Sequence, residues 1–326
     1  MKICFLDKTP FFYNSSHLNS PILRGAETAL INLASTLNNL GHDITVINNC
    51  PKNETISNIN WININSLDTQ LIFDLAISNN DCRFFDKVIS NKKVLMSHSI
   101  QSFEKFLRKN QFFSYFKHKP KVALLGNYHK KKRSFLTRCY GFFYLDYGVD
   151  NIFIKTKIDD NFVVDKDLAI FTSRPDRNLD LLIDIWKSRI YPKYSKGKLL
   201  VTPTKKPIDD CNIFFRKLLD RENLIKDLSK SRILLIPGHK AELYCLAAEE
   251  ARELCVPIIT LGLGSLSERV QHGKTGFIAK NINEFAKYTL EIFSNDSLWN
   301  DLRSNLIKLR GSKSWMKCSK NLIENI

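Results

Sequence analysis

The sequence lacks any run of about 18 apolar residues, so it predicts no transmembrane helix. Its first residues, MKICFLDKTPFF, contain an apolar stretch that Asp7 and Lys8 interrupt before it reaches the length of a signal-peptide core. Its eight cysteines include no CxxC pair and no Cys/His spacing typical of a metal site. Without an export signal, the simplest expectation is a cytoplasmic protein with reduced thiols.

Acidic residues are scarce relative to basic ones, and the formal net charge is +16. The excess is concentrated between Arg83 and Arg138, where fifteen Lys and Arg stand against two acids, a net charge of +13. Such a field attracts polyanions, which include anionic lipid surfaces, nucleic acid and acidic substrates. A solvated basic surface explains the same charge equally well.

The length of 326 residues predicts two domains. The first 47 residues read as a buried strand (KICFLD), an amphipathic helix that ends at Gly41, and a second strand (HDITVIN). Strand, helix and strand in this order form a βαβ unit, and such units build parallel sheets. Further strands are expected at LIFDLAIS, KKVLMSH and KVALLGN.

A second alternation of strands and helices begins at LAIFTS and continues to the C-terminal helical segment. The sequence therefore predicts an α/β fold of two doubly wound, Rossmann-like domains, with no internal repeat. We expect an N-terminal domain at 1–155, a C-terminal domain at 156–308, and a helix at 309–326 that packs back toward the N-terminal domain. In such folds ligands bind beyond the carboxyl ends of the strands, and here also between the domains.

Glu242 and Glu250 are candidate site residues in the C-terminal half of the sequence. Glu250 lies inside the apolar stripe of a helix, between Leu246 and Leu254, where a carboxylate is costly unless it has a partner. Glu242 precedes the same helix. The periodicity turns three other charged residues toward solvent: Glu249, Arg252 and Glu253. A salt-bridged glutamate at the edge of the core explains Glu250 as well as a binding site does.

The surrounding residues resemble the retaining glycosyltransferases of family four. That family has a glutamate, seven residues and Glu-Ala, then a GVPVIA-like strand, a Gly-rich turn with a glutamate, and G-x-T-G-hydrophobic. The matching residues here are Glu242, Glu250-Ala251, Val256-Pro257, Gly264 with Glu268, and Gly273, Thr275, Gly276 and Phe277. Several matches in order over about forty residues are specific, whereas a pair of glutamates alone is weak.

Three other segments are similar to the same family. RGAETALINLASTLNNLGHDITV resembles its GGAE helix start, with Arg24 in place of the first glycine, and YGVDNIF resembles its NGVD segment, with Tyr147 in place of Asn. TSRPDRNLDLL resembles the segment whose Arg and Lys hold the donor diphosphate, so Arg174 and Arg177 would take those roles. A basic loop before a helix is the alternative for these two arginines.

The resemblance implies a GT-B fold and a retaining, metal-independent hexosyltransferase with no cofactor beyond a UDP- or GDP-linked sugar donor. Glu250 would bind the ribose, Glu242 the sugar, and Gly25 and Glu268 other parts of the donor. His98 would approach the transferred sugar, although a structural histidine is the alternative. Arg174 and Arg177 would stabilise the leaving diphosphate.

The acceptor is expected to be a glycan or a lipid-linked molecule, in the synthesis of cell-surface polysaccharide or glycoconjugate. A basic cluster is a candidate for contact with the acceptor phosphate or with an anionic membrane at its inner face, and a solvated loop is its alternative: Lys130, Lys131, Lys132 and Arg133. Three other functions stay open. They are a nucleotide-sugar epimerase or hydrolase of the same fold, a basic nucleic-acid-binding protein, which lacks a recognition motif and is not expected, and a non-catalytic partner subunit.

Overall fold

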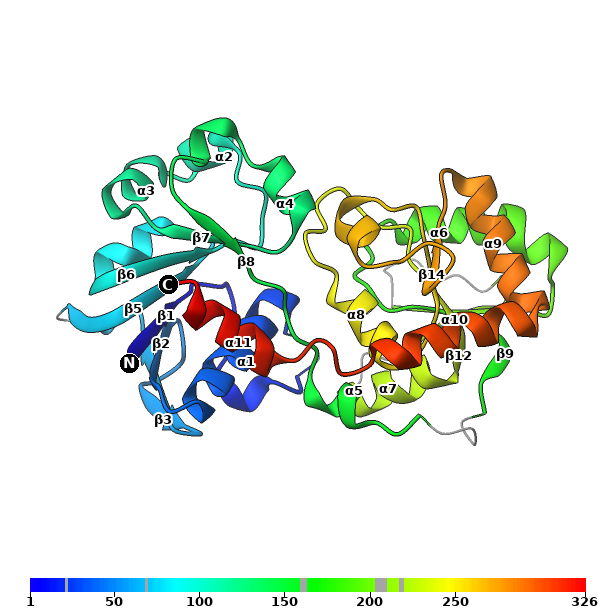
Figure 1. Ribbon diagram of the computed structural model, residues 1–326, viewed down its shortest axis with the longest axis horizontal. Coiled ribbons are helices and arrows are strands. Elements are labelled where there is room, and N and C mark those ends of the chain that lie inside the picture. Colours follow the sequence, from blue (N-terminus) through cyan, green and yellow to red (C-terminus); the bar gives the residue numbers. More distant parts are fainter. Residues whose placement is uncertain (21–22, 68–69, 159–162, 203–209, 217–219) are drawn as a thin grey trace. The chain divides into compact units, whose positions relative to one another are not determined.

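The computed structural model describes residues 1–20, 23–67, 70–158, 163–202, 210–216 and 220–326, and it divides the chain into two compact units (Figure 1). The first unit is Met1–Gly148 with Lys313–Ile326, and the second is Val149–Ser312. The sequence placed the boundary after residue 155, whereas the structure places it after Gly148. The reason is that Phe153 belongs to the core of the second unit.

The first unit is a mainly parallel sheet with helices packed around it. Its strands are β1 (Lys2–Leu6), β2 (Asp43–Asn48), β3 (Glu54–Ile56), β4 (Ile59–Asn63), β5 (Leu71–Asn79), β6 (Val88–Met96), β7 (Lys121–Leu124) and β8 (Phe142–Tyr144). They lie in the order β3-β4-β2-β1-β5-β6-β7-β8, and each neighbouring pair is parallel except β3 and β4. Its α-helices are α1 (Gly25–Asn39), α2 (Phe103–Arg108), α3 (Phe112–His118), α4 (Asn127–Lys132) and α11 (Trp315–Glu324). Its 3₁₀ turns are η1 (Ser15–His17), η2 (Cys82–Lys87) and η3 (Phe135–Thr137).

The β3–β4 hairpin is an element that the sequence prediction missed. Its turn is Ser57-Asn58, and both residues have positive φ angles, 53° and 60°. Left-handed residues at both turn positions match the right-handed twist of the strands that they connect. On β4, Ile59 and Trp61 point into the core and are completely buried. The predicted strand–helix–strand unit at β1, α1 and β2 is confirmed.

The second unit is a six-stranded sheet, all of it parallel. Its strands are β9 (Asp165–Phe171), β10 (Lys198–Val201), β11 (Ile213–Phe215), β12 (Ser231–Leu235), β13 (Ile258–Thr260) and β14 (Gly276–Ile278). They lie in the order β11-β10-β9-β12-β13-β14. Its α-helices are α5 (Asn151–Lys155), α6 (Leu179–Ile185), α7 (Arg221–Lys230), α8 (Leu246–Glu253), α9 (Ile282–Ser294) and α10 (Asp296–Leu309). The chain continues from α6 through a π-helical turn (Trp186–Ile190) and a 3₁₀ turn (Tyr191–Lys193), and η6 (Gly264–Glu268) is a second 3₁₀ turn.

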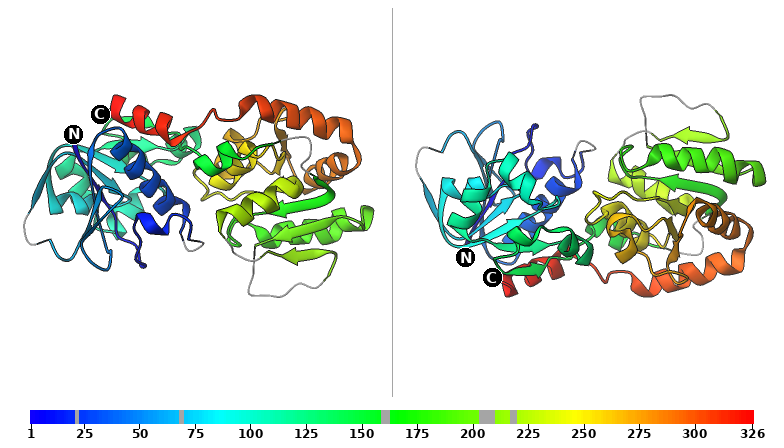
Figure 2. Two further views of the ribbon diagram at one scale, coloured as in Figure 1. Left: turned by 90° about the horizontal axis from the view of Figure 1, so that it is seen from below. Right: turned by 90° about the horizontal axis from the view of Figure 1, so that it is seen from above.

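Figure 2 shows the strands of each sheet lying between helices, so both units are doubly wound as predicted. In the second unit the order of strands reverses between β9 and β12, which are neighbours in the sheet although two strands separate them in sequence. Such a reversal is where ligands bind in folds of this kind. Among the described residues, no helix combines the length and apolarity needed to cross a membrane.

The C-terminal helix returns to the first unit and packs against α1. The return is fixed where Gly148 meets the start of α11. A Cβ atom added at Gly148 would lie 2.7 Å from Trp315 Cα and closer still to the Trp315 backbone nitrogen. Beside this contact, the rings of Tyr147 and Trp315 are 5.4 Å apart, and Lys313 Nζ donates to Asp146 Oδ1 at 3.0 Å.

We predict that Gly148→Ala lowers the free energy of unfolding of the first unit by about 1–3 kcal/mol, because the methyl group needs space that the α11 backbone occupies. Thermal or urea unfolding followed by circular dichroism measures this loss. Gly141→Ala is the matched control, because a Cβ there would meet only the flexible Lys121 side chain, at 3.9 Å. Equal stability of the two variants would contradict the tight approach.

Candidate active site

The loops that follow β9, β12 and β13 carry most of the predicted donor residues. These three strands are consecutive neighbours in a parallel sheet, so their carboxyl ends lie at one edge. Arg174 and Arg177 follow β9, Glu242 follows β12, and Gly264 follows β13. The topology therefore gathers residues that are separated by up to about ninety positions in sequence.

The structure brings three of the predicted residues into contact. Arg177 Nε donates to Glu242 Oε2 at 3.1 Å, and both side chains are mostly shielded from solvent. Arg174 Nη2 and Arg177 Nη1 each lie 2.9 Å from Asp176 Oδ2. Asp176 was missed by the sequence analysis, although its place between the two arginines was visible. The result is a cluster of two guanidinium groups and two carboxylates at the sheet edge.

The backbone under Glu242 is held by the neighbouring loop. Gly264 has a φ of 71°, and a Cβ there would lie 2.7 Å from the Glu242 carbonyl oxygen and closer still to that of His239. Ser265 N donates to Glu242 O at 2.9 Å. Asn178 Nδ2 donates to Gly238 O at 2.6 Å, which ties the loop after β9 to the loop after β12. Only glycine combines this conformation with so close an approach.

Glu250 is half-buried on α8, and no hydrogen bond to its side chain is present in the described part of the chain. Burial raises the pKa of its carboxyl group above the ordinary value, and the negative charge of Asp150 raises it further. The positive charges of Arg221 and Arg216 act in the opposite direction but do not cancel the effect of burial. Arg221 and Asp150 form an ion pair with each other. Arg216 is buried, with Nε donating to Asp227 Oδ2 at 3.0 Å. Arg221 begins α7, Asp150 caps the start of α5, and Arg216 follows β11, and the sequence analysis did not connect any of the three with Glu250.

One prediction about α8 is wrong. Glu249, Arg252 and Glu253 were expected to face solvent, and all three are buried. The reason is that α8 also packs against α10 and α5, so that few of its residues remain exposed.

The buried charges on α8 are paired. Glu249 lies 2.9 Å from Arg269 Nη1 and 3.0 Å from Arg252 Nη1. Arg252 Nη2 lies 2.7 Å from Glu253 Oε1, and Gly311 N donates to Glu253 Oε2 at 2.8 Å. We call Glu249, Arg252, Glu253 and Arg269 the α8 charge network. Next to it, the Arg269 guanidinium lies 4.2 Å from the centre of the Tyr244 ring, and Glu268 Oε2 is 3.8 Å from Arg269 Nη2.

In the first unit, His98 follows β6 and is held on two sides. Tyr147 Oη is 2.6 Å from His98 Nε2, and the His98 backbone N donates to Asn80 Oδ1 at 2.7 Å. Burial, with a smaller contribution from His129, lowers the pKa of His98 to about 3. The imidazole is therefore neutral at physiological pH, so it can exchange hydrogen bonds with a hydroxyl group but supplies no positive charge.

Gly25 is the first residue of α1 and is exposed. Arg24, which precedes it, makes no side-chain capping bond, and its guanidinium lies 5.5 Å from the centre of the Phe11 ring. Gly25 is therefore accessible to a ligand at the start of α1, and the positively charged Arg24 precedes it. Its role toward the donor stays a prediction.

The predicted basic cluster on α4 is smaller than expected. Lys130, Lys131 and Lys132 are exposed, whereas Arg133 is buried and is not part of the surface. Arg133 Nη2 lies 3.4 Å from Tyr115 Oη and also donates to the Thr137 carbonyl oxygen. Its guanidinium thus serves to connect α3 with η3.

Residues 205–309 match the family model "Glycosyl transferases group 1". The matched part lies in the second unit and makes up less than half of the chain. It contains Glu242, Glu250, Gly264 and Glu268. The narrower assignment to family four stays a prediction.

Solved structures that are similar to this chain cover nearly all of it, and the chain shares their GT-B fold. Sucrose-phosphate synthase from Thermosynechococcus elongatus has a TM-score of 0.75 at 12% identity, over 99% of this chain and 98% of that one. WaaG, a glycosyltransferase involved in lipopolysaccharide biosynthesis, has a TM-score of 0.73 at 12% identity, over 99% of each chain. HepE from Anabaena, in complex with UDP-glucose, has a TM-score of 0.69 at 15% identity, over 100% of this chain and 99% of that one. No curated protein sequence matches the chain.

No group of three His, Cys, Asp or Glu side chains able to hold a metal ion occurs in the ranges that the structure describes. The sequence also contains two Asp-Asp pairs, Asp159-Asp160 and Asp209-Asp210, of which Asp159, Asp160 and Asp209 lie outside those ranges. Metal-independent transfer therefore stays a prediction.

We predict that Glu249→Gln destabilises the second unit by about 3–5 kcal/mol, because it leaves Arg252 and Arg269 buried without their shared carboxylate. Thermal unfolding measures the loss. The matched control is Glu291→Gln on α9, where the partner Lys287 is 3.7 Å away and both side chains are exposed, so about 0–1 kcal/mol is expected. Similar losses in both variants would show that the α8 charge network is not energetically special.

We also predict that the first unit loses stability as the pH falls from about 6.5 to about 4. Burial, with help from Arg133, lowers the pKa of the completely buried His129 to about 4, so the unfolded chain binds a proton in this window and the folded chain does not. Between pH 7.5 and 5.0 the difference is about 1–2 kcal/mol. His129→Asn should therefore show a smaller drop in unfolding temperature over this range than the wild type. The exposed His272→Asn should keep the wild-type drop, and an unchanged drop in His129→Asn would refute the assignment.

Proposed function

We propose that the protein is a retaining glycosyltransferase that transfers a hexosyl group from a nucleoside-diphosphate sugar to a glycan or lipid-linked acceptor, without a metal ion. The observation that carries this proposal is the cluster of Arg174, Arg177 and Glu242 at the edge of the second unit's sheet where the strand order reverses. UDP-glucose in the complex of HepE supports a UDP-linked donor, and a GDP-linked donor has the same charged diphosphate.

The two arginines are suited to the leaving diphosphate. Guanidinium groups make forked hydrogen bonds to phosphate oxygens and keep their charge at all relevant pH values. In the structure, Asp176 accepts from both of them. A diphosphate would compete with this carboxylate for the same donors, and its developing negative charge in the transition state would then be stabilised without a cation.

Glu250 would bind the ribose of the donor, and Glu242 would bind its sugar. The half-buried Glu250 carboxylate has accepting capacity to spare for the ribose hydroxyls. Glu242 is paired with Arg177. When Arg177 turns toward the diphosphate, Glu242 becomes available to the sugar hydroxyls, so binding of the diphosphate prepares the sugar site. Glu268 and Gly25 complete the proposed set of donor residues.

The first unit would supply the acceptor side. Neutral His98, oriented by Tyr147, would exchange a hydrogen bond with the transferred sugar. Lys130, Lys131 and Lys132 would contact an anionic membrane or the phosphate of a lipid-linked acceptor. Synthesis of a cell-surface polysaccharide or glycoconjugate fits this acceptor class, and WaaG is a structural relative involved in lipopolysaccharide biosynthesis.

A panel of UDP-, GDP- and ADP-sugars in a thermal-shift assay, with and without EDTA, tests the proposal. We expect one nucleotide class to raise the unfolding temperature, with no effect of EDTA. No stabilisation by any of them would reject a donor site. Release of free nucleotide or epimerised donor at full rate without an acceptor would instead identify a hydrolase or epimerase.

Substitutions of the two glutamates should separate their roles. Glu250→Gln is expected to weaken nucleotide binding by roughly ten- to a hundredfold, because it loses charge-assisted hydrogen bonds. Glu242→Gln should leave nucleotide affinity within a few-fold and lower the transfer rate by about a hundredfold. Isothermal titration and a transfer assay with the donor found above measure the two effects, and Glu291→Gln is the surface control. Equal effects of both substitutions on affinity would contradict the division of roles.

A further inference from the structure

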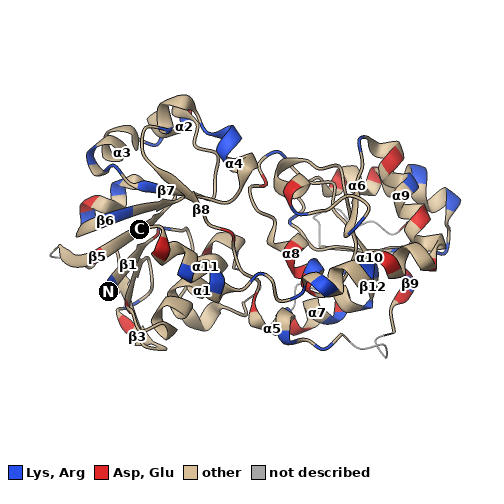
Figure 3. Ribbon diagram, in the orientation of Figure 1, with Lys and Arg blue, Asp and Glu red and all other residues tan. Residues whose placement is uncertain are grey.

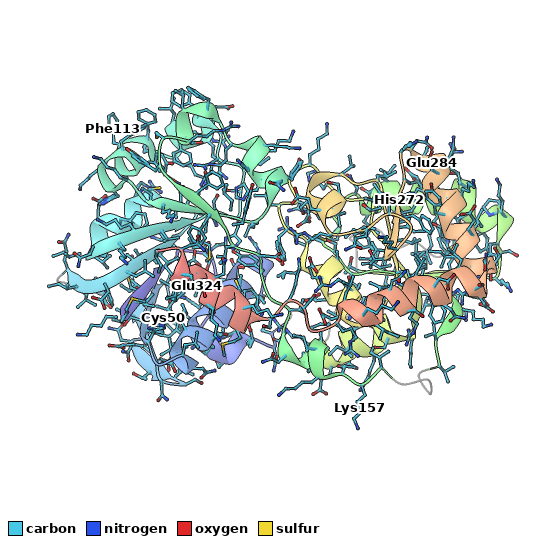
Figure 4. The ribbon with its side chains drawn as sticks, in the orientation of Figure 1. Cys50, Phe113, Lys157, His272, Glu284 and Glu324 are labelled. Carbon is cyan, nitrogen blue, oxygen red and sulfur yellow. The ribbon has the colours of Figure 1, made fainter. Side chains whose placement is uncertain are left out.

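The helices α2 and α3 carry an apolar surface that is not part of the core. Leu107, Phe113 and Phe116 are exposed, and 84% of Phe113 is accessible to solvent. In Figure 4 the Phe113 side chain projects away from the body of the first unit. Aromatic side chains are normally buried, so an exposed group of them indicates a surface used for binding.

Ring contacts connect the exposed Phe113 and Phe116 with half-buried aromatic side chains, and Leu107 is exposed on α2. The rings of Phe103 and Phe112 are 5.6 Å apart, those of Phe112 and Phe116 are 4.7 Å apart, and those of Phe112 and Phe113 are 6.0 Å apart. The ring of Tyr140 lies 5.9 Å from that of Phe116. We call this set the aromatic ridge: Phe103, Leu107, Phe112, Phe113, Phe116 and Tyr140.

The same two helices already have a core-facing side. Phe106 of α2 and Tyr115 of α3 are buried, with their rings 5.2 Å apart, and Tyr115 Oη donates to the Thr137 carbonyl oxygen at 2.7 Å. The aromatic ridge is therefore a second apolar face, which packing within the unit does not require. The turn η3 is fastened to α3 at Thr137, and it carries Phe135, which is 83% exposed.

Basic side chains border the aromatic ridge. Residues 103–119 contain five Lys and Arg and a single acid, Glu104. Within the described ranges, Lys117 is paired with Asp86, while no ion pair to Arg108, Lys109 or Lys119 is present. Figure 3 shows blue segments on both α3 and α4. The surface thus combines apolar side chains with the positive charges of Arg108, Lys109 and Lys119, with which no acid in the described ranges forms an ion pair.

We propose that the aromatic ridge docks the first unit on an anionic lipid bilayer. Phenylalanine and leucine side chains insert at the boundary between headgroups and acyl chains, while lysine and arginine remain at the level of the anionic headgroups. A protein partner with an apolar groove would need the aromatic groups but not the cations. Nucleic acid would need the cations but has no apolar layer to receive Leu107 and Phe113.

This proposal extends the membrane contact proposed for α4 to a second surface, which adds apolar side chains that can insert into the bilayer. The proposal does not depend on the donor site. Lysines alone give a salt-sensitive attraction, whereas inserted side chains add attachment that survives screening. The aromatic ridge is therefore expected to provide the part of membrane binding that remains at high salt.

Co-flotation with vesicles tests the docking without any nucleotide sugar. The full chain is expected to float with vesicles of equal parts phosphatidylcholine and phosphatidylglycerol and to remain unbound with phosphatidylcholine alone. Phe113→Ser with Phe116→Ser should weaken binding about tenfold at both low and high salt. Arg108→Glu with Lys109→Glu and Lys119→Glu should weaken it about a hundredfold at low salt.

The control variants make the same kinds of substitution at exposed positions outside the aromatic ridge. Ile72→Ser removes an apolar side chain that is 70% exposed on β5, and the exposed set Lys226→Glu, Lys230→Glu and Lys308→Glu matches the change of charge in the second unit. Both controls should float like the wild type, and all variants should keep the wild-type unfolding temperature. Phe113→Trp should shift its fluorescence to shorter wavelength on anionic vesicles, whereas Ile72→Trp should not.

The proposal is overturned by no flotation of the wild type, by equal losses in the controls, or by undiminished high-salt binding of the Phe113/Phe116 variant. If only a Lys130→Glu, Lys131→Glu, Lys132→Glu variant lost binding, the contact would belong to α4 and the aromatic ridge would be excluded. Self-association of the wild type without vesicle binding would instead assign the aromatic ridge to a second copy of the chain. Nucleotide binding is measured separately, so failure here leaves the donor site standing.

Discussion

The second unit depends on the burial of charge along α8. A helix that carried its acids to solvent could shift or rotate at little cost, but Glu249 and Glu253 are inside the protein together with Arg252 and Arg269. Buried ions are tolerated only in the geometry that pairs them, so each contact restricts where the helix can lie. Glu250 is consequently presented at a fixed place, and the link from Gly311 to Glu253 connects that place to the end of α10.

The arginine–carboxylate cluster after β9 and β12 has the opposite character. Its members are partly exposed, and their pairs can exchange for contacts with a ligand at modest cost. The second unit thus combines a rigid helix with a rearrangeable set of charges at the same sheet edge. This combination suits the proposed donor, whose diphosphate would have to be held during the reaction and released afterwards.

Much of the fold could be predicted because its strands and helices have strong local patterns. The strands β1, β2, β9 and β12 could be predicted from their continuous apolar runs, and α1 could be predicted from its 3.6-residue period. Several short elements were missed, among them the three-residue strands β8 and β11, because such strands are set by their neighbours in the sheet and leave no period to detect.

Within the candidate site, the sequence indicated Glu242, Glu250, Arg174 and Arg177 through the order of the motif around them. It could not show that Asp176 joins the two arginines, nor that Arg221 and Asp150 lie near Glu250, because these contacts depend on how loops converge. The error at Glu249, Arg252 and Glu253 has a related cause. A helical wheel separates apolar from polar faces, but it cannot detect that α10 covers the polar face and that ion pairs make this possible. Arg133 was placed on the surface for the same reason, since a run of four basic residues gives no sign that the last one turns inward.

The contact at Gly264 also limits how such a site can diverge. Its α-carbon faces the carbonyl oxygens of His239 and Glu242, which leaves no room for any side chain, so the path of the main chain beneath the proposed sugar position cannot be altered by substitution there. A change of donor preference would have to come from the side chains between residues 239 and 244, while the main chain that carries them keeps its path. A library designed to change the transferred sugar should therefore vary that short segment and leave the glycine untouched.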